Sequence, residues 1–527
     1  MPFRRDAGAP HEIRELGILS MHPIAKFKAA SGQVLAGALL ATTAIVLGGS
    51  NPSASQAISE AAKPGLPSNR EIFGYVQDLV DFGPRRTGTE ANVKTADYIA
   101  NKFRDFGLRD VAVETGTTTQ WSASKWGLSI DGVGIPAFYM RHSFNTGKEG
   151  SFSTGSDGIK AEFIYVGNRK DLTGIDVRGK VVVADVELGT INMAAIQRGA
   201  NLVYDPAKTL NVKSRLDPFT PNNFPFNFAS AVKGGAVGFI GILSNYMDSN
   251  RFYNEDVAYF VDDDFHLSLP GLWLSRKEGD VVKAMLREKP NAVGRLDLEG
   301  EVKKVRYRTV LGHLPGQNRE TIMVQSHHDS GFSGAVEDAT GVAEVLALAR
   351  YYGHNAQKPR NRSMVFVAMD SHFTGYEAHE DFAKNKIGSA GLDVVANVTV
   401  EHVAREMEIK NGEAKMTGHV DPRVFITSPS LIDLTSRTVQ QRDYRRSLVI
   451  STKAFPHEAG LPTDVGPIRK ITGIPVISLI SAPAYLYDIS DTLDKVAVDQ
   501  LQPTASVVSE LLDGLDTMPR GEIGLDK

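Results

Sequence analysis

Hydrophobic residues in the second half of the chain fall into short runs that alternate with amphipathic segments. Four runs have the length and apolar content of buried strands, at 321–325, 364–369, 397–400 and 474–479. Between the first two, apolar residues recur at helical spacing, at Val342, Val345, Leu346 and Ala349. Buried strands that alternate with helices predict an α/β fold, with a mainly parallel mixed sheet flanked by helices.

Further helices are predicted at both ends of this region. Ser68 and Glu71 form a capping box, which opens an amphipathic helix running to about residue 80. A second helix is expected over 90–106, before Gly107, and a terminal helix over 496–512.

The stretch between about 120 and 290 has a different character, with Gly- and Asn-rich loops and short β-type runs. We interpret 150–290 as an inserted β-rich domain, and 58–149 with 291–527 as the domain that it interrupts.

Composition narrows the class of protein. The chain has 527 residues, of which 42% are hydrophobic and 23% charged, as in ordinary globular proteins. The formal net charge of −4 gives no basic field for nucleic acid, so no nucleic-acid partner is expected. The absence of cysteine excludes a disulfide scaffold, a thiol nucleophile and a Cys-ligated metal.

The first 57 residues predict export. Lys26 and Lys28 precede an apolar run at 34–47, and a small-residue cleavage pattern ends at Ala57. We interpret 1–57 as a signal peptide with an upstream segment, cleaved after Ala57. The mature chain would then be secreted or periplasmic, with no stable membrane span. A single N-terminal anchor helix is the alternative, although the run is short of the roughly 20 residues that a span needs.

Imidazole and carboxylate groups follow the predicted strands, where ligands of α/β sheets gather. They lie at 327–329, 337–338, 370–372 and 401–402. Such groups suit a borderline divalent metal, most plausibly Zn²⁺. Any one of them has a simpler explanation, and Glu337 with Asp338 could be capping the next helix. Recurrence at three strand ends in order favours a shared metal site.

Several motifs together resemble peptidase family M28, the co-catalytic zinc aminopeptidases and carboxypeptidases. The metal-ligand signature is matched by 327–330 and 334–341, and the other matches are 82–89, 314–316, 463–464 with 473–475, and 491–496. The segments 176–182 and 234–240 resemble a protease-associated domain, which many members carry as an insertion.

The resemblance implies a ligand set, with departures. His327 matches the first ligand, Glu337 stands where the family has a bridging Asp, and Glu401 stands for a later Asp. An ungapped match puts Met369 and Asp370 at the family's paired glutamates, so that Asp370 would be a ligand and the usual base would be absent.

The last His ligand of the family falls on Tyr487. Two histidines would compensate for these losses. His372 is predicted as the general base, and His457 as the replacement nitrogen ligand.

The sequence thus predicts a secreted metal-dependent hydrolase of a peptide or other amide bond. Its substrate would be a peptide or an N-acyl amide, and its cofactor one or two Zn²⁺ ions, of which one is held tightly. The inserted domain is expected to supply no metal ligand. A non-catalytic, receptor-like protein with a degraded site is the main alternative. Acyl transfer, as in the glutaminyl cyclases that share this fold, is a further one.

Overall fold

The computed structural model describes residues 63–526, apart from 263, 389–390 and 456–460. The chain divides into two units, Met1–Glu60 and Ala61–Lys527, and all of the described residues belong to the second. The predicted signal peptide and its cleavage site lie outside the described residues. In the part that is described, no helix is both long enough and apolar enough to cross a membrane.

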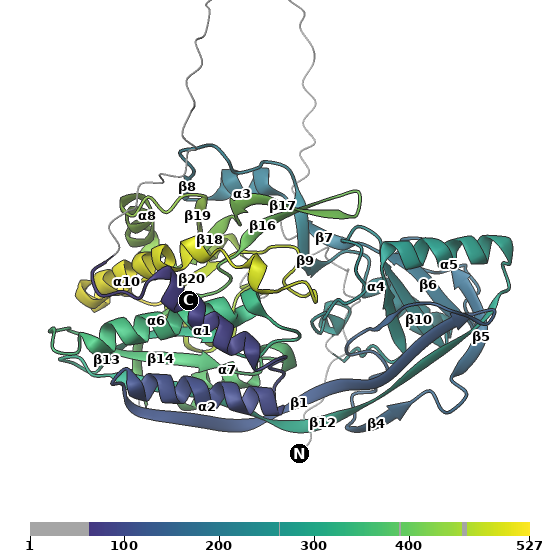
Figure 1. The fold of residues 1–527 in the computed structure, drawn as a ribbon, viewed down its shortest axis with the longest axis horizontal. Coiled ribbons are helices and arrows are strands. Elements are labelled where there is room, and N and C mark those ends of the chain that lie inside the picture. The colour runs from purple at the N-terminus through teal and green to yellow at the C-terminus, as the bar shows by residue number, and fades with distance from the viewer. Residues whose placement is uncertain (1–62, 263, 389–390, 456–460, 527) are drawn as a thin grey trace, which may run out of the picture. The chain divides into compact units, whose positions relative to one another are not determined.

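Buried parallel strands form the centre of the sheet (Figure 1). The order is β14, β13, β15 and β20, which span Ser363–Met369, Glu320–His327, Asp393–Val400 and Val476–Ile480. Nearly all of their residues are buried, which explains why their apolar runs are continuous. The sheet continues through antiparallel β18 (Arg423–Thr427) and then β19 (Ser447–Ser451). This mixed, mainly parallel sheet confirms the predicted fold class.

Helices pack on both faces of the sheet, because alternate strand residues point in opposite directions. Met364 and Phe366 of β14 belong to the main core, whereas Val365, Val367 and Met369 belong to a second apolar cluster. The main core also takes residues from α1, α2, α6 and α10, which span Asn69–Asp81, Glu90–Asp105, Gly341–His354 and Leu501–Thr517. The second cluster takes residues from α7 and α9, which span Glu377–Asn385 and Val465–Thr472.

The predicted helices begin where the sequence indicates, except for the terminal helix. Ser68 and Glu71 form the expected capping box of α1. The terminal helix α10 begins at Leu501, five residues later than predicted, because Val496 is extended and Val498–Gln500 form a short 3₁₀ turn. Pro503 falls in the first turn of α10, where its missing N–H costs nothing.

Two long strands connect the central sheet to the middle of the chain. β1 (Arg109–Ile130) and β12 (Val293–Leu314) pair antiparallel over almost their whole length. β12 pairs with β14 near one end and with β5 near the other. Beyond β5 the strand order is β6, β10, β11 and β3. These strands span Ile159–Tyr165 (β5), Val181–Val186 (β6), Gly238–Leu243 (β10), Gly271–Leu274 (β11) and Phe138–Tyr139 (β3).

Helix α5 (Arg276–Glu288) packs on this second group of strands, and α4 (Phe226–Gly234) lies between β9 and β10 in the chain. Part of the segment 150–290 joins the sheet that contains β13 and β14, because β8 (Leu202–Tyr204) pairs with β19. β7 and β9, at Leu188–Ile191 and Arg215–Pro221, pair antiparallel as a separate two-stranded sheet. The remaining strands and helices are β2 (Val133–Gly134), β4 (Gly150–Ser153), α3 (Met193–Gly199), β16 (Arg405–Lys410), β17 (Glu413–Val420), α8 (Ile432–Gln441) and α11 (Arg520–Ile523).

Candidate metal centre

The carboxyl ends of the central strands bring a set of buried acidic and imidazole groups together. His327 is the last residue of β13, and Glu337 lies in the helical turn that follows. His372 comes just after β14, and His402 just after β15. Asp464 precedes α9. All five side chains are buried, so their charges must be balanced within the protein or by a bound ion.

Glu337 lies between two imidazoles without forming a hydrogen bond to either. Its Oε1 is 3.1 Å from His327 Nε2, and its Oε2 is 2.6 Å from His402 Nε2. Within the described residues, all four atoms are buried and have no hydrogen-bond partner. Atoms that bind the same zinc ion lie about 3 Å from one another. The nitrogen and oxygen atoms here have the spacing of neighbouring ligands of one ion.

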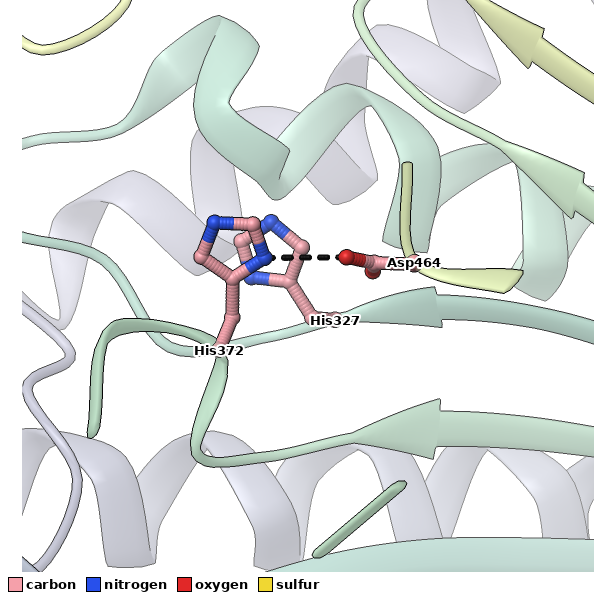
Figure 2. Close-up of side chains that lie close together, drawn as sticks. All are labelled: His327, His372 and Asp464. Atoms are coloured by element: carbon pink, nitrogen blue, oxygen red, sulfur yellow. Dashed lines mark hydrogen bonds and ion pairs between the residues drawn. The ribbon is translucent and has the colours of Figure 1, made fainter. Parts of the chain in front are cut away.

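His327 also lies next to His372 and Asp464 (Figure 2). The two rings stack with their centroids 4.0 Å apart, and one potential ligand atom from each of the three residues lies within 4.8 Å of the others. His372 Nδ1 is 2.9 Å from Asp464 Oδ1, a hydrogen bond. Asp464 Oδ2 is buried and has no hydrogen-bond partner among the described residues, although His379 Nε2 lies 3.7 Å away. The donor set of nitrogen and carboxylate oxygen fits a divalent ion such as zinc.

A second layer of hydrogen bonds holds this cluster in place. The carbonyl of Asp329 lies 3.1 Å from His327 Nδ1, which leaves His327 Nε2 to face Glu337. Asp491 accepts the backbone N–H groups of Val336 and Glu337, each at 2.9 Å. The geometry of both candidate ligands is therefore fixed by the protein.

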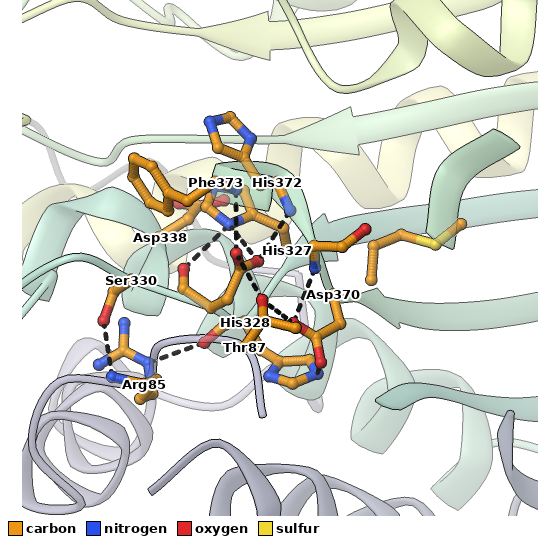
Figure 3. Close-up of polar contacts among 12 residues, drawn as sticks. Arg85, Thr87, His327, His328, Ser330, Asp338, Asp370, His372 and Phe373 are labelled. Atoms are coloured by element: carbon orange, nitrogen blue, oxygen red, sulfur yellow. Dashed lines mark hydrogen bonds and ion pairs between the residues drawn. The ribbon is translucent and has the colours of Figure 1, made fainter. Parts of the chain in front are cut away.

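Asp370 lies in this second layer and not in the cluster (Figure 3). Its oxygens accept from the Thr87 hydroxyl at 2.8 Å, from the Ser371 N–H at 2.7 Å and from the Arg308 N–H at 2.7 Å. Thr87 also donates to Asp329. The carboxylate predicted as a ligand is thus occupied in holding the loops together.

The loop after β14 presents different residues from those in the ungapped match. Met369 points into the second apolar cluster, away from the candidate ligands. Asp329 accepts the backbone N–H groups of His372 and Phe373 and so holds both residues beside the cluster. His372 and Phe373, three positions along from Met369 and Asp370, are the pair that reaches the site from this loop.

The hydroxyls of two neighbouring residues bind the Glu401 side chain. Glu401 Oε1 accepts hydrogen bonds from the hydroxyls of Thr463 and Ser478. Burial and the nearby Asp464 carboxylate raise the pKa of Glu401 to about 8. His457 lies outside the described residues.

Glu337 also lines a small pocket with mixed walls. Phe332, Phe373, Leu486 and Tyr487 supply aromatic and apolar side chains, and Asp488 and Asp491 supply carboxylates. Tyr487, which stands where the family resemblance expects a His ligand, donates its hydroxyl to Glu255. Glu255 Oε1 lies 3.2 Å from His372 Nε2.

Three residues of this centre were given no role by the sequence analysis. His402 and Asp464 lie within segments that it singled out, but neither was given a role. Glu255 comes from the predicted inserted domain, in a segment without any motif, so no local signal identifies it.

The charges in the cluster show a surplus of carboxylates. Burial disfavours the charged form of His402, but the Glu337 carboxylate outweighs it and raises the pKa of His402 to about 10. Burial and the His327 charge likewise disfavour protonation of His372, yet Asp464 and Glu255 raise its pKa to about 10. A site in which carboxylates favour extra positive charge is suited to a divalent cation.

Comparisons with known proteins identify the second half of the chain. Residues 309–512 match the family model described as Peptidase family M28. The chain carries a peptidase family M28 domain. This match confirms the resemblance seen in the motifs.

A curated relative is the Glutamate carboxypeptidase 2 homolog of Caenorhabditis elegans, 21% identical over 472 residues. The match takes in 75% of this chain, and the chain spans about 60% of the relative's length.

Solved structures share the fold. The Peptidase M28 precursor of Shewanella amazonensis SB2B is 17% identical, with a TM-score of 0.62 over 85% of this chain and 93% of that one. The zinc aminopeptidase BSAP of Bacillus subtilis is 15% identical, with a TM-score of 0.60 over 87% and 98%. The aminopeptidase of Aneurinibacillus sp. strain AM-1 is 18% identical, with a TM-score of 0.55 over 84% and 93%.

Proposed function

We propose that this M28 protein is a secreted hydrolase of peptide or other amide bonds that works with one divalent metal ion, most plausibly zinc. The observation that carries the proposal is the group of buried potential ligands around His327. Glu337 Oε1 lies 3.1 Å from its Nε2, and His372 and Asp464 each have a potential ligand atom within 4.8 Å. Unpaired polar atoms in a protein interior are costly, and a shared cation is the simplest group that would satisfy all of them.

In this proposal His327 Nε2, the Glu337 carboxylate and Asp464 Oδ2 hold the ion. Three protein ligands are the usual number for a catalytic zinc. His402 lies beside Glu337 as a further polar neighbour, with its Nε2 2.6 Å from Glu337 Oε2. A divalent ion bound there supplies polarisation of a carbonyl oxygen and acidification of water.

His372 is proposed as the residue that takes a proton from the attacking water and passes it to the leaving amine. Its imidazole would be neutral only with the divalent ion bound, because that positive charge offsets the carboxylates that raise its pKa. Its Nδ1 is held by Asp464 at 2.9 Å, which fixes the ring and directs Nε2 toward Glu255 and Glu337. An imidazole fixed by a carboxylate is a common form of general acid–base catalyst.

A non-catalytic binding protein is the second candidate function. The observation that favours it is the pocket beside Glu337, where Phe373 and Tyr487 offer no strong metal ligand. The buried His and carboxylate donors around His327 weigh against it, because a site that only binds a partner has no need for them.

Two further proposals come from the sequence. Cleavage after Ala57 would deliver the chain to the cell exterior or the periplasm. The middle of the chain would form a protease-associated-like domain, and the short parallel strands β5, β6, β10 and β11 support a separate folding unit there.

The test combines metal removal with hydrolysis. The purified chain is assayed against a panel of peptides and N-acyl amides, then after chelation, and again after zinc is added back. We expect hydrolysis that disappears with chelation and returns with zinc. Hydrolysis that resists chelation would contradict the metal role, and a zinc-loaded chain that cleaves no member of the panel would favour the binding protein.

A further inference from the structure

We propose that Arg141 is a positioning residue, whose guanidinium holds the loop of His372 next to the loop of Glu255. This inference rests on the proposed function, because it concerns the proton acceptor of the same site. Arg141 follows strand β3 in the chain and is only 1% exposed.

The guanidinium of Arg141 binds the main chain of two segments that are far apart in sequence. Its Nη1 donates to the carbonyl of Asn254 at 3.1 Å, and its Nη2 donates to the carbonyl of Phe373. Phe373 is the chain neighbour of His372, and Asn254 is the chain neighbour of Glu255. One planar group with several donors thus links the segment that carries the imidazole to the segment that carries the carboxylate.

The two linked segments bring their side chains into contact. Glu255 Oε1 lies 3.2 Å from His372 Nε2. Asp464 holds His372 at Nδ1, and Asp329 holds its backbone N–H, but Glu255 lies in a different part of the chain, between β10 and β11. Arg141 connects that part of the chain directly to the loop of His372.

Asn254 holds the backbone of Arg141 in return. Its Oδ1 accepts the Arg141 N–H at 3.1 Å, and its Nδ2 donates to the Arg141 carbonyl at 3.0 Å. The indole N–H of Trp273 donates to the same Oδ1 at 3.0 Å. The guanidinium therefore reaches its two carbonyls from a backbone that is itself fixed.

The environment of Arg141 is unusual for a buried charge. Buried arginines are normally paired with carboxylates. The hydrogen bonds of this guanidinium go to carbonyls, and its Nε is buried without a partner among the described residues. It lies over the rings of Tyr253 and Phe373, 4.5 and 5.8 Å from their centroids, and these contacts offset part of the lost hydration. Packing alone needs no charge at this place, so the arrangement favours a specific role for the two donors.

Hydrogen–deuterium exchange on the purified full chain tests this link without any need for turnover. The N–H groups of His372 and Phe373 are bound to Asp329, and that of Tyr253 to the carbonyl of Tyr487, so their exchange reports local opening. In Arg141→Lys we expect exchange to rise about 10-fold in 252–256 and in 371–375 but to stay unchanged in β13 and β14. Lysine lacks the planar fork that spans both carbonyls, and a hydrogen bond from a charged group is worth at least that factor.

Steady-state kinetics on the zinc-loaded chain tests the positioning role. In Arg141→Lys we expect kcat to fall about 10-fold while KM and zinc content stay unchanged, because the proton acceptor is misplaced and the ligands are not. Arg141→Gln, which also removes the charge, should lower kcat further.

Arg251→Lys is the matched control. Arg251 is an exposed arginine three residues before Asn254, and its guanidinium lies over the ring of Phe138. The same chemical change there should leave exchange, kcat and KM as they are in the parent chain.

The outcomes separate this inference from the proposed function. Unchanged exchange in both segments, exchange that rises equally in β13 and β14, or loss of the whole fold in Arg141→Lys would each overturn the positioning role. A parent chain that hydrolyses amides with a kcat that Arg141→Lys does not alter would also overturn it and leave the function standing. A parent chain that hydrolyses nothing, with the expected local rise in exchange, would support the link and overturn the function.

Discussion

The two sides of Glu337 differ sharply in chemistry. On one side lie His327, His402 and Asp464, which are buried and offer nitrogen and oxygen lone pairs. Phe373 and Tyr487 line a small pocket next to Glu337, together with Asp488 and Asp491.

The proposal of a single tightly held ion rests on this difference. The M28 resemblance implies two metal positions that share a bridging carboxylate, and Glu337 stands at that bridge. His327 and Glu337 keep donor atoms at the positions that the resemblance implies, whereas Phe373 and Tyr487 stand where the family has a Glu and a His. The predictions that follow test this asymmetry, beginning with the largest expected effect.

Removal of a donor from the polar side should abolish both metal binding and activity. In His327→Ala we expect zinc content near zero after dialysis and a loss of hydrolysis of about 10³-fold or more, because the Lewis acid is gone. Elemental analysis and peptide hydrolysis provide the two readouts. His419→Ala is the control, since His419 is an exposed histidine of β17. A His327→Ala chain that retains its zinc would refute the ligand assignment.

The proposed proton acceptor should be separable from the ligands. His372→Ala should retain zinc but reduce turnover by roughly 10²–10⁴-fold, which is the usual contribution of general acid–base catalysis. Zinc content and kcat are measured on the same preparation. Full activity in this variant would show that another group takes the proton.

The pocket beside Glu337 should accept a second ion once ligands are restored there. The double variant Phe373→Glu with Tyr487→His places a carboxylate and an imidazole beside Glu337, which are groups that zinc binds. We expect the zinc content to rise from one to two ions for each chain. A zinc content that stays at one ion would mean that residues other than Phe373 and Tyr487 also prevent a second ion from binding.

A buried carboxylate outside the centre shows the cost of having no partner. Glu344 in α6 is buried, and within the described residues its oxygens have no hydrogen-bond partner. Burial therefore raises the pKa of Glu344 well above its ordinary value of 4.5. The folded chain keeps this proton where the unfolded chain releases it, so stability falls as the pH rises above the ordinary value, by up to about 1.4 kcal/mol for each pH unit.

Glu344→Gln removes this proton linkage. Urea denaturation at about pH 5 and about pH 8 should show a smaller loss of stability for the variant than for the parent chain, since only the parent has a proton to lose. Equal losses would mean that Glu344 is not protonated in the folded state.

Much of the fold can be predicted from sequence, because its signals are local. The apolar runs at 321–325 and 364–369 correspond to β13 and β14, and the capping box at Ser68 begins α1 as expected. The start of α10 is less predictable, because a 3₁₀ turn and an α-helix share the same apolar spacing there.

The site is only partly predictable, because contacts across the chain decide which side chains point inward. His327 and Glu337 follow from the motif, and His372 from its place near a strand end. Asp370 shows the limit: its sequence position suits a ligand, but Thr87 and Arg308, both far away in sequence, take up its oxygens.

Glu255 could not be found from sequence at all. It is separated from His372 by 117 positions, and only the folded chain brings its carboxylate to the imidazole.

The most direct test of the central claim is the number of zinc ions bound by the unmodified chain. Elemental analysis of the purified protein, together with an independent measurement of protein concentration, gives this number. We predict one tightly held ion for each chain, retained through dialysis. Two equally tight ions, or none, would contradict a centre that holds a single ion.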